Sequence, residues 1–200
     1  MNTPHLYLAS QSPRRQQLLT QMGVSFEVLL PADTQAAEDL EQVLPGEKPL
    51  AYVQRVTLLK LKATKLQLQQ TKQPVHPVLC ADTTVVLGQD ILGKPAHALE
   101  AQAMLSRLSG QTHQVFTALA LSDGRRIHKT VSRSKVTFAP LSEADIAAYV
   151  ASGEPMGKAG AYGIQGLAAC FIKSIQGSYS GIMGLPVYET HQLLRRLDKD

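Results

Sequence analysis

The chain has 200 residues, of which 44% are hydrophobic, and a formal net charge of +4. This is enough apolar material for one packed domain, which we expect to span residues 1–200 without a disordered or repetitive segment. No apolar run approaches the ~20 residues that a membrane helix needs, and the N-terminus lacks a charged-then-apolar signal. We therefore expect a cytoplasmic protein with no membrane partner.

The basic charge permits a nucleic-acid partner, but other features argue against one. There is no long Lys/Arg tract, and aromatic residues make up only 5% of the chain, so stacking platforms and a basic stripe are missing. A small anion is the simpler partner. Cys80 and Cys170 each lie in an apolar stretch without metal-type or redox-type spacing, so we expect two buried free thiols.

The expected elements of the first half of the chain begin with a short strand. In order they are a strand at 5–9, a helix at 16–22, a strand at 25–30, a polar stretch with a short helical piece at 31–49, and the longest helix at 49–70. A buried strand at 78–87 follows, and it carries one charge, that of Asp82.

The second half is expected to contain more strand. Its elements are a turn at 88–90, a helix at 101–108, strands at 113–121 and 126–138 joined by an Asp-Gly hairpin, a helix from a capping box at 142–145 to about 152, a glycine-rich passage at 157–166, a strand at 168–175 and a last helix ending at 197. Helices and strands without strict alternation predict a mixed α/β fold rather than a doubly wound sheet.

The turn at residues 10–15, Ser-Gln-Ser-Pro-Arg-Arg, is built like a receptor for an oxyanion. It joins a strand to a helix, and Ser12 and Pro13 are typical first residues of a helix. Ser10, backbone N–H groups and the side chains of Arg14 and Arg15 would then converge on a phosphate. Taken alone, the motif favours a capped helix with two solvated arginines.

Asp82 is the strongest single candidate for chemistry, because it lies within an expected buried strand. An unpaired carboxylate there is costly, so we expect it at a cleft, facing a divalent cation or positive side chains, where it orients or deprotonates a water. An aspartate in a structural hydrogen-bond network explains this segment equally well.

Three further residues extend the candidate site. Lys94 lies in a Gly-Lys-Pro turn that limits its freedom, and Lys60 lies on the long helix, where a solvated lysine is the simpler interpretation. Gln165 lies in the glycine-rich passage and offers a donor and an acceptor to the edge of a base. A structural glycine turn explains that passage as well. The sequence contains no motif typical of a catalytic triad or of a histidine metal site.

Together these motifs closely resemble the Maf family of nucleoside triphosphate pyrophosphatases, in order and over nearly the whole chain. The matching segments are Leu8-Ala-Ser-Gln-Ser-Pro-Arg-Arg15, Ala81-Asp-Thr83, Gly93-Lys-Pro95, Lys158-Ala-Gly-Ala-Tyr-Gly-Ile-Gln-Gly166 and Gly184-Leu-Pro186. Asp-Thr and Ile-Gln-Gly resemble the dTTP/UTP-specific branch; the 7-methyl-GTP branch tends to have Asp-Gln and Ser-Glu-Gly there.

The resemblance implies an activity and roles for residues. It implies hydrolysis of dTTP and UTP to the nucleoside monophosphate and pyrophosphate with Mg²⁺ or Mn²⁺, with Asp82 as proton acceptor and as a metal ligand. Arg14, Thr83 and Gln165 match positions associated with substrate choice. The residues that match the phosphate pocket are Ser10, Arg15, Lys60 and Lys94, and the two lysines join Asp82 in the catalytic set.

The resemblance also implies an architecture and a biological setting. The family fold is an elongated, ITPase-like mixed sheet with flanking helices and two lobes around a central cleft, and it is often a homodimer. The implied role is nucleotide-pool housekeeping, with a link to cell-division arrest. Modified nucleotides such as pseudouridine triphosphate and 5-methyl-UTP fit the same expectation, and the alternative is a non-catalytic, nucleotide-binding regulator of septum formation.

One departure concerns the metal. Members of the family often have paired acids after the second strand, where this chain has Asp33 without a neighbouring acid. Asp33 or Glu38 could substitute, and Asp90 matches a frequent acid in the hairpin turn. We rank all three below Asp82 as metal ligands.

Overall fold

The computed structural model describes residues 5–197, and its mixed α/β fold confirms the expected class. A seven-stranded mixed sheet has the order β2-β1-β3-β5-β6-β7, with β4 also paired to β3. The strands are β1 (Leu6–Ala9), β2 (Phe26–Val28), β3 (Val78–Leu87), β4 (Asp90–Leu92), β5 (Thr112–Ser122), β6 (Ile127–Phe138) and β7 (Ile172–Gln176). β1 runs parallel to β2 and β3, and the other pairings are antiparallel.

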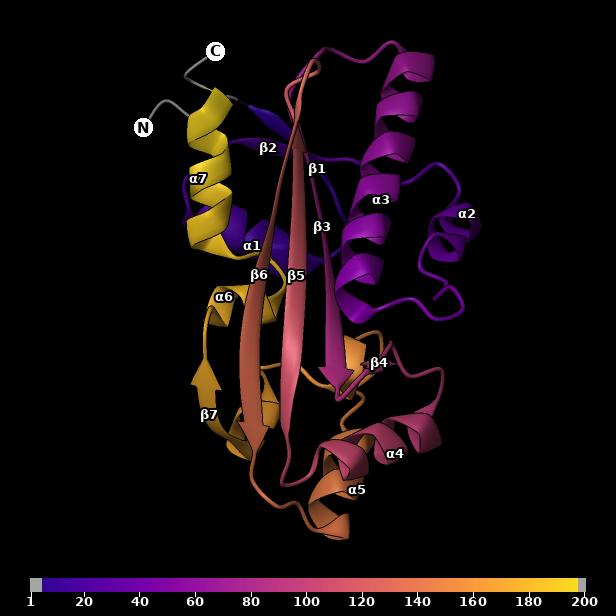
Figure 1. Ribbon diagram of the computed structural model, residues 1–200, viewed down its shortest axis with the longest axis vertical. Helices are drawn as coiled ribbons and strands as arrows, with labels where there is room; N and C mark the ends of the chain where they lie inside the picture. The colour runs from indigo at the N-terminus through magenta and orange to yellow at the C-terminus, as the bar shows by residue number, and fades with distance from the viewer. Residues whose placement is uncertain (1–4, 198–200) are drawn as a thin grey trace.

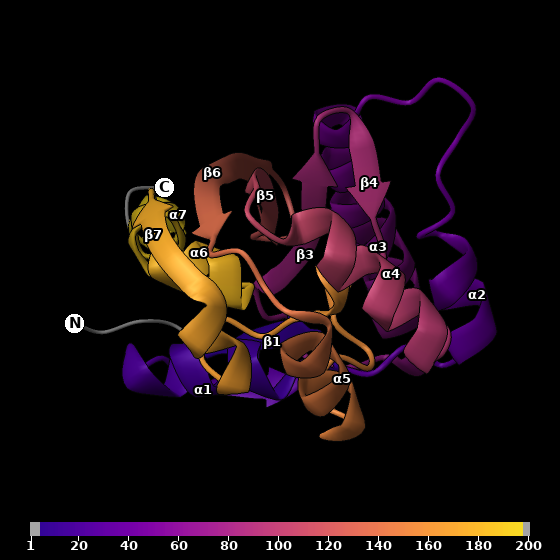
Figure 2. The same cartoon turned by 90° about the horizontal axis from the view of Figure 1, so that it is seen from below.

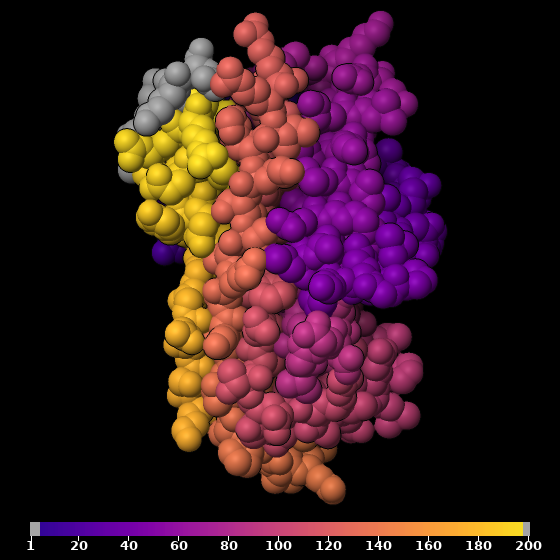
Figure 3. Space-filling model, in the orientation of Figure 1, coloured from indigo at the N-terminus to yellow at the C-terminus, as the bar shows by residue number. Residues whose placement is uncertain are grey.

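Helices flank the sheet along an elongated molecule (Figure 1). They are α1 (Pro13–Gln21), α2 (Thr34–Asp39), α3 (Pro49–Thr71), α4 (Ala98–Leu108), α5 (Glu143–Ala151), α6 (Tyr179–Met183) and α7 (Val187–Leu197), with the 3-10 turns η1 (Ala159–Ala161) and η2 (Leu167–Phe171). The long strands β3, β5 and β6 connect an upper half, which holds α1, α3 and α7, to a lower half, which holds α4 and α5 (Figure 1). Figure 2 shows α4 and α5 from below. Figure 3 shows the same elongated outline in space-filling form.

β3 is buried on both faces, which explains its nearly continuous apolar sequence. Alternate residues point to opposite faces of a strand. Val78, Cys80 and Val86 face the apolar clusters that α3 covers, whereas Leu79 and Val85 belong to the main core on the other face. By the same alternation, Asp82 points toward α3 and its neighbour Thr83 points the other way.

The edge of β3 is interrupted where Asp82 lies. On one side β5 pairs along its length, from Val78 to Val86. On the other side β1 pairs only as far as Cys80, and β4 begins to pair at Val85. Within the described residues, no strand covers residues 81–84 on that side, so the sheet has a gap there.

The expected strand at 168–175 is wrong in its first half. Leu167–Phe171 forms the 3-10 turn η2, and only Ile172–Gln176 forms a strand. The backbone of the first part is used locally, because the Ala169 N–H donates to the Gly166 carbonyl at 3.0 Å. Pairing with β6 begins at Ile172 and includes an irregularity at Thr137 and Phe138.

The same 3-10 turn explains a second correction, which concerns the cysteines. Cys80 is buried, as expected, but Cys170 lies on η2 and is exposed.

Among residues 5–197, no helix has both the length and the apolar character needed to cross a membrane.

We predict that one thiol per native chain reacts rapidly with a disulfide reagent such as DTNB and that the second reacts only after unfolding. Burial raises the pKa of the Cys80 thiol to about 12, and the thiolate is the reactive form. Spectrophotometric titration with and without denaturant checks this, and the C170A variant should lose the fast phase. Loss of the slow phase in C170A would contradict the assignment.

Candidate active site

A pocket of about 430 Å³ lies at the gap in the edge of β3. Segments distant in sequence line it: the turn before α1, the loop after α2, one side of α3, the middle of β3, Gly93 and Lys94, the passage at 157–165, and residues 182–184. Its charged side chains are five cations and three acids, namely Arg14, Arg15, Lys60, Lys94, Lys158, Glu38, Glu41 and Asp82. The lining also contains all eight residues that the sequence assigned to catalysis and substrate binding, namely Ser10, Arg14, Arg15, Lys60, Asp82, Thr83, Lys94 and Gln165.

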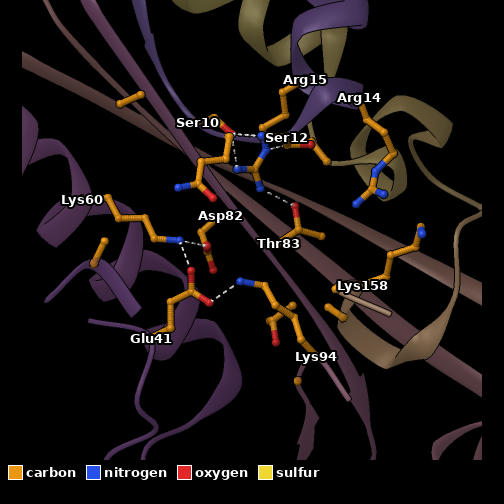
Figure 4. A pocket seen from close by; sticks show the side chains of 18 of the residues that line it. Ser10, Ser12, Arg14, Arg15, Glu41, Lys60, Asp82, Thr83, Lys94 and Lys158 are labelled. Carbon is orange, nitrogen blue, oxygen red and sulfur yellow. Dashed lines mark hydrogen bonds and ion pairs between the residues drawn. The ribbon is translucent and has the colours of Figure 1, made fainter. Parts of the chain in front are cut away.

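Arg15 connects three of these segments (Figure 4). Its guanidinium donates from Nη1 to Ser10 Oγ at 3.1 Å, from Nη2 to Thr83 Oγ1 at 3.4 Å, and from Nε to the Gly184 carbonyl at 2.9 Å. Burial lowers the pKa of Arg15, with Asp82 acting in the opposite direction, and an arginine still remains charged under these conditions. Arg15 is thus a fixed cation in the wall of the pocket.

Arg14 is held less tightly than Arg15. Its Nε donates to the Met183 carbonyl at 3.2 Å, and no ion pair of Arg14 with a described carboxylate is present. Pro13 is the first residue of α1, as expected, but the Ser12 side chain does not cap the helix. Ser12 is thus the N-cap residue and Pro13 the first helical residue, as expected, but the cap has no side-chain hydrogen bond. The Ser12 N–H instead donates to Ser10 Oγ at 3.1 Å.

Asp82 belongs to a chain of alternating charges. Lys60 Nζ lies 2.6 Å from Asp82 Oδ1 and 2.6 Å from Glu41 Oε1, and Lys94 Nζ lies 2.8 Å from Glu41 Oε2. Figure 4 shows the ammonium of Lys60 between the two carboxylates. Asp82 is only 7% exposed, so Lys60 supplies the counter-charge that such a carboxylate needs.

The pKa values of Lys60 and Glu41 are both shifted by the charges around them. Burial by itself would lower the pKa of Lys60, but Asp82 and Glu41 outweigh it, so that this pKa is raised. Burial would raise the pKa of Glu41, but Lys60 and Lys94 outweigh it, so that this pKa is lowered. Lys60 and Glu41 therefore each favour the charged form of the other.

Glu41 is a site residue that the sequence analysis missed. It lies in the polar stretch after α2, and α3 fixes the loop that carries it. Tyr52 donates its hydroxyl proton to the Glu41 carbonyl at 2.9 Å, and Arg55 donates to the carbonyls of Leu40 and Gln42. Arg55 also forms a forked ion pair with Glu47, at 2.6 and 2.7 Å. The only available signal was that this stretch is rich in acids.

The other three expected metal ligands do not join this network of charges, and only Glu38 among them lines the pocket. Asp33 is exposed and caps α2 by accepting from the Ala36 N–H. Asp90 is exposed and pairs with Arg107 at 2.5 Å. Neither Asp33 nor Asp90 lines the pocket. Glu38 lines the pocket but is exposed, with no ion pair to a described residue. Glu41, rather than any of these, meets Asp82 through Lys60.

The glycine-rich passage forms the wall opposite this chain of charges. Gly160 has a φ of +68°, and a Cβ there would lie 2.8 Å from Val85 Cγ1, so glycine is required for this close approach to β3. Gln165 is exposed and lines the pocket. Lys158, also missed by the sequence analysis, lies near Arg14 (Figure 4), and burial followed by repulsion from Arg14 lowers its pKa.

The donor set suits a hard divalent cation that is also held by a ligand. Asp82 and Glu41 supply two carboxylates that share Lys60, and Mg²⁺ typically binds through one or two carboxylates together with substrate phosphates and water. The described residues contain no cluster of three or more His, Cys, Asp or Glu side chains able to hold a metal by themselves. The arrangement thus fits a cation shared with a phosphate ligand.

The comparisons with known proteins agree with the motifs. Residues 5–197 match the family described as "Maf-like protein", and the chain belongs to this family. It is 58% identical to the "dTTP/UTP pyrophosphatase" of Polaromonas sp. over 190 residues, which cover 95% of this chain and 94% of the relative. The proteins of the same name from Albidiferax ferrireducens and Cupriavidus pinatubonensis are 56% and 55% identical, covering 95% and 96% of each chain, respectively.

A solved structure, that of the Staphylococcus aureus Ham1 protein, is more distantly similar. It has a TM-score of 0.40 at 12% identity, with 70% of this chain and 72% of that chain covered. The family membership thus stands on the sequence matches, and the resemblance to the Maf family is confirmed.

We predict that the K60M substitution raises the pKa of Glu41. Without Lys60, burial still raises this pKa and only Lys94 opposes it. Carboxyl carbon chemical shifts followed by NMR over a pH titration measure the change. K62M is the matched control, because Lys62 is exposed on the same helix. An unchanged Glu41 pKa in K60M would contradict the ion pair.

Proposed function

We propose that this protein hydrolyses dTTP and UTP between the α and β phosphates, giving the nucleoside monophosphate and pyrophosphate. One observation carries the proposal: a buried carboxylate, Asp82, lies in the same pocket as five cationic side chains, at a gap in the sheet. The name of the relatives at 55–58% identity, dTTP/UTP pyrophosphatase, supports the same substrates.

The charge of the pocket fits a triphosphate bound together with a metal. The lining has two more cations than acids, which is less charge than a triphosphate carries. We infer that Arg14, Arg15, Lys60 and Lys94 bind phosphate oxygens together with Ser10. Phosphoryl transfer asks a protein mainly for positioning and for stabilisation of developing charge, and fixed cations provide both.

Asp82 and Glu41 are the residues that would hold Mg²⁺ or Mn²⁺. When bound, a divalent cation polarises the phosphate and neutralises part of its charge. Asp82 would orient the attacking water and accept its proton, since its carboxylate is the most buried acid of the pocket. Lys60 keeps that carboxylate in place from the α3 side through the 2.6 Å contact.

Arg14, Thr83 and Gln165 would select the base of the nucleotide. The side chain of Gln165 can donate one hydrogen bond and accept another, which suits the edge of uracil or thymine. Thr83 Oγ1 lies 2.9 Å from Thr117 Oγ1 and accepts from Arg15, so it would connect the base to the phosphate-binding arginine. Pseudouridine triphosphate and 5-methyl-UTP would fit the same contacts.

Other features of the protein stay predictions. These are the homodimer, the cytoplasmic location, a single domain over residues 1–200, the nucleotide-pool role, and the absence of a nucleic-acid partner. None of them is needed for the chemistry proposed at the pocket.

We expect the purified protein to release pyrophosphate, not orthophosphate, from dTTP, UTP and their modified analogues, and to act poorly on CTP and purine triphosphates. An assay of both products over this panel, with Mg²⁺, Mn²⁺ and EDTA, checks this. Release of orthophosphate would refute the cleavage position. Tight binding without turnover would instead support the nucleotide-binding regulator of septum formation.

We predict that D82N lowers kcat by about 100-fold or more, because the amide cannot accept the proton of the water. D90N is the matched control and should keep wild-type kcat, since Asp90 is exposed and paired with Arg107 outside the pocket. Steady-state kinetics, with circular dichroism to verify folding, make the comparison. A folded D82N protein with full turnover would remove the central assignment.

A further inference from the structure

The segment that carries Gln165 is held by side chains that lie outside the pocket. Tyr162, Gly163, Ile164 and Gln165 line the pocket. The residues that bind this segment are His113 on β5, Tyr149 on α5 and Glu154 just after α5, and none of these three lines the pocket. Their side chains therefore hydrogen-bond the segment without lining the pocket, while Glu154 also holds the pocket residue Lys158 through its carbonyl oxygen.

Tyr149 and Glu154 bind both ends of the segment. The Gly163 N–H donates to the Tyr149 hydroxyl oxygen at 3.2 Å, and this hydroxyl donates to Glu154 Oε1 at 2.9 Å. The second oxygen, Glu154 Oε2, accepts from the Leu167 N–H at 2.9 Å. One phenol and one carboxylate thus tie down the residues on either side of Gln165, two positions away in each direction.

The packing against Glu154 is close. A Cβ at Gly166 would clash with both carboxylate oxygens of Glu154, so a larger residue there would displace the Glu154 side chain from its present position. The Lys158 ammonium donates to the Glu154 carbonyl, which holds the start of the glycine-rich passage to the same residue. The contact therefore constrains position as well as hydrogen bonding.

His113 supports the segment from the sheet. Its Nε2 lies 2.8 Å from the Tyr162 hydroxyl, and its ring meets Phe138 and Tyr162 edge to face. Burial lowers the pKa of His113 to about 4, so the ring is neutral at physiological pH. The segment therefore has a third fixed point immediately before Gly163.

We propose that Tyr149 and Glu154 are positioning residues that set the base preference by holding Gln165, an inference that rests on the proposed function. Gln165 is exposed and has no hydrogen-bonding partner of its own among the described residues. The hydrogen bonds that position it are therefore those to the backbone of Gly163 and Leu167 on either side. An amide that recognises a base through hydrogen bonds must be held within a fraction of an ångström. Release of either end of the segment therefore lowers the selectivity between bases.

The expected signature is a loss of selectivity that leaves the phosphate chemistry intact. The chain Asp82, Lys60, Glu41 and Lys94 receives no contact from Tyr149 or Glu154. Y149F keeps the ring and removes only the hydroxyl. We expect it to lower the ratio of kcat/KM for UTP over CTP by about tenfold, the effect of one misplaced polar contact, with little change in kcat/KM for CTP.

The experiment is a double-mutant cycle with Q165A, in which UTP and CTP are compared for the wild type, Y149F, Q165A and the double variant. If Tyr149 acts through Gln165, the double variant shows the same selectivity as Q165A alone. E154Q is the second variant of the pair and should also lower the ratio. Y179F is the matched control, because Tyr179 is exposed and does not line the pocket, and its ratio should stay at the wild-type value.

The proposal would be overturned if Y149F lowered kcat/KM equally for UTP and CTP. It would also be overturned if the double variant had a lower UTP/CTP ratio than Q165A alone. Binding of the non-hydrolysable α,β-imido analogues of UTP and CTP separates it from the proposed function. A wild type that binds the uridine analogue preferentially but turns over neither nucleotide would refute the proposed activity. Loss of that preference in Y149F would then still support the positioning role, and a wild type without any preference would overturn it.

Discussion

The arrangement of the pocket depends on one interruption in the sheet, the four residues of β3 that lie between the end of β1 and the start of β4. A continuous strand neighbour would have covered this edge. Because side chains alternate along a strand, the gap presents Asp82 to α3 on one face and Thr83 to α1 on the other. Two neighbouring residues thereby reach Lys60 and Arg15, which belong to different parts of the molecule. The pocket can thus draw on both faces of one sheet.

The buried charge of Asp82 is tolerable only because the helix opposite is fixed. Val53, Val56 and Leu61 bury one side of α3 against the sheet, and this packing sets the rotation that aims Lys60 at β3. The same helix holds the Glu41 loop through Tyr52 and Arg55. Packing and electrostatics are therefore coupled: the apolar side of α3 fixes where the cation and the second carboxylate lie.

Local pattern predicted the elements whose signals are local. The apolar run of β3, the Asp-Gly hairpin between β5 and β6, and the capping box of α5 all appear as expected. Motif resemblance located Asp82, Lys60, Lys94 and Arg15 in one pocket. Glu41 was not predicted because its position depends on the hydrogen bonds of Arg55 to the loop that carries it. These contacts join residues distant in sequence and leave no periodic pattern. The 3-10 turn that exposes Cys170 was not predicted, because the apolar residues of that segment also fit a strand.

The bridge that Glu41 makes between Lys60 and Lys94 has a consequence for what the pocket accepts. Both lysines already hold a carboxylate, so an anion that binds them replaces an internal counter-ion rather than filling an empty receptor. An exchange of this kind gains little for a singly charged anion, because one ion pair replaces another. It favours ligands that contact several cations at once and also bring a cation for the released carboxylate. These two lysines therefore discriminate against small, singly charged anions, independently of the base that the pocket selects.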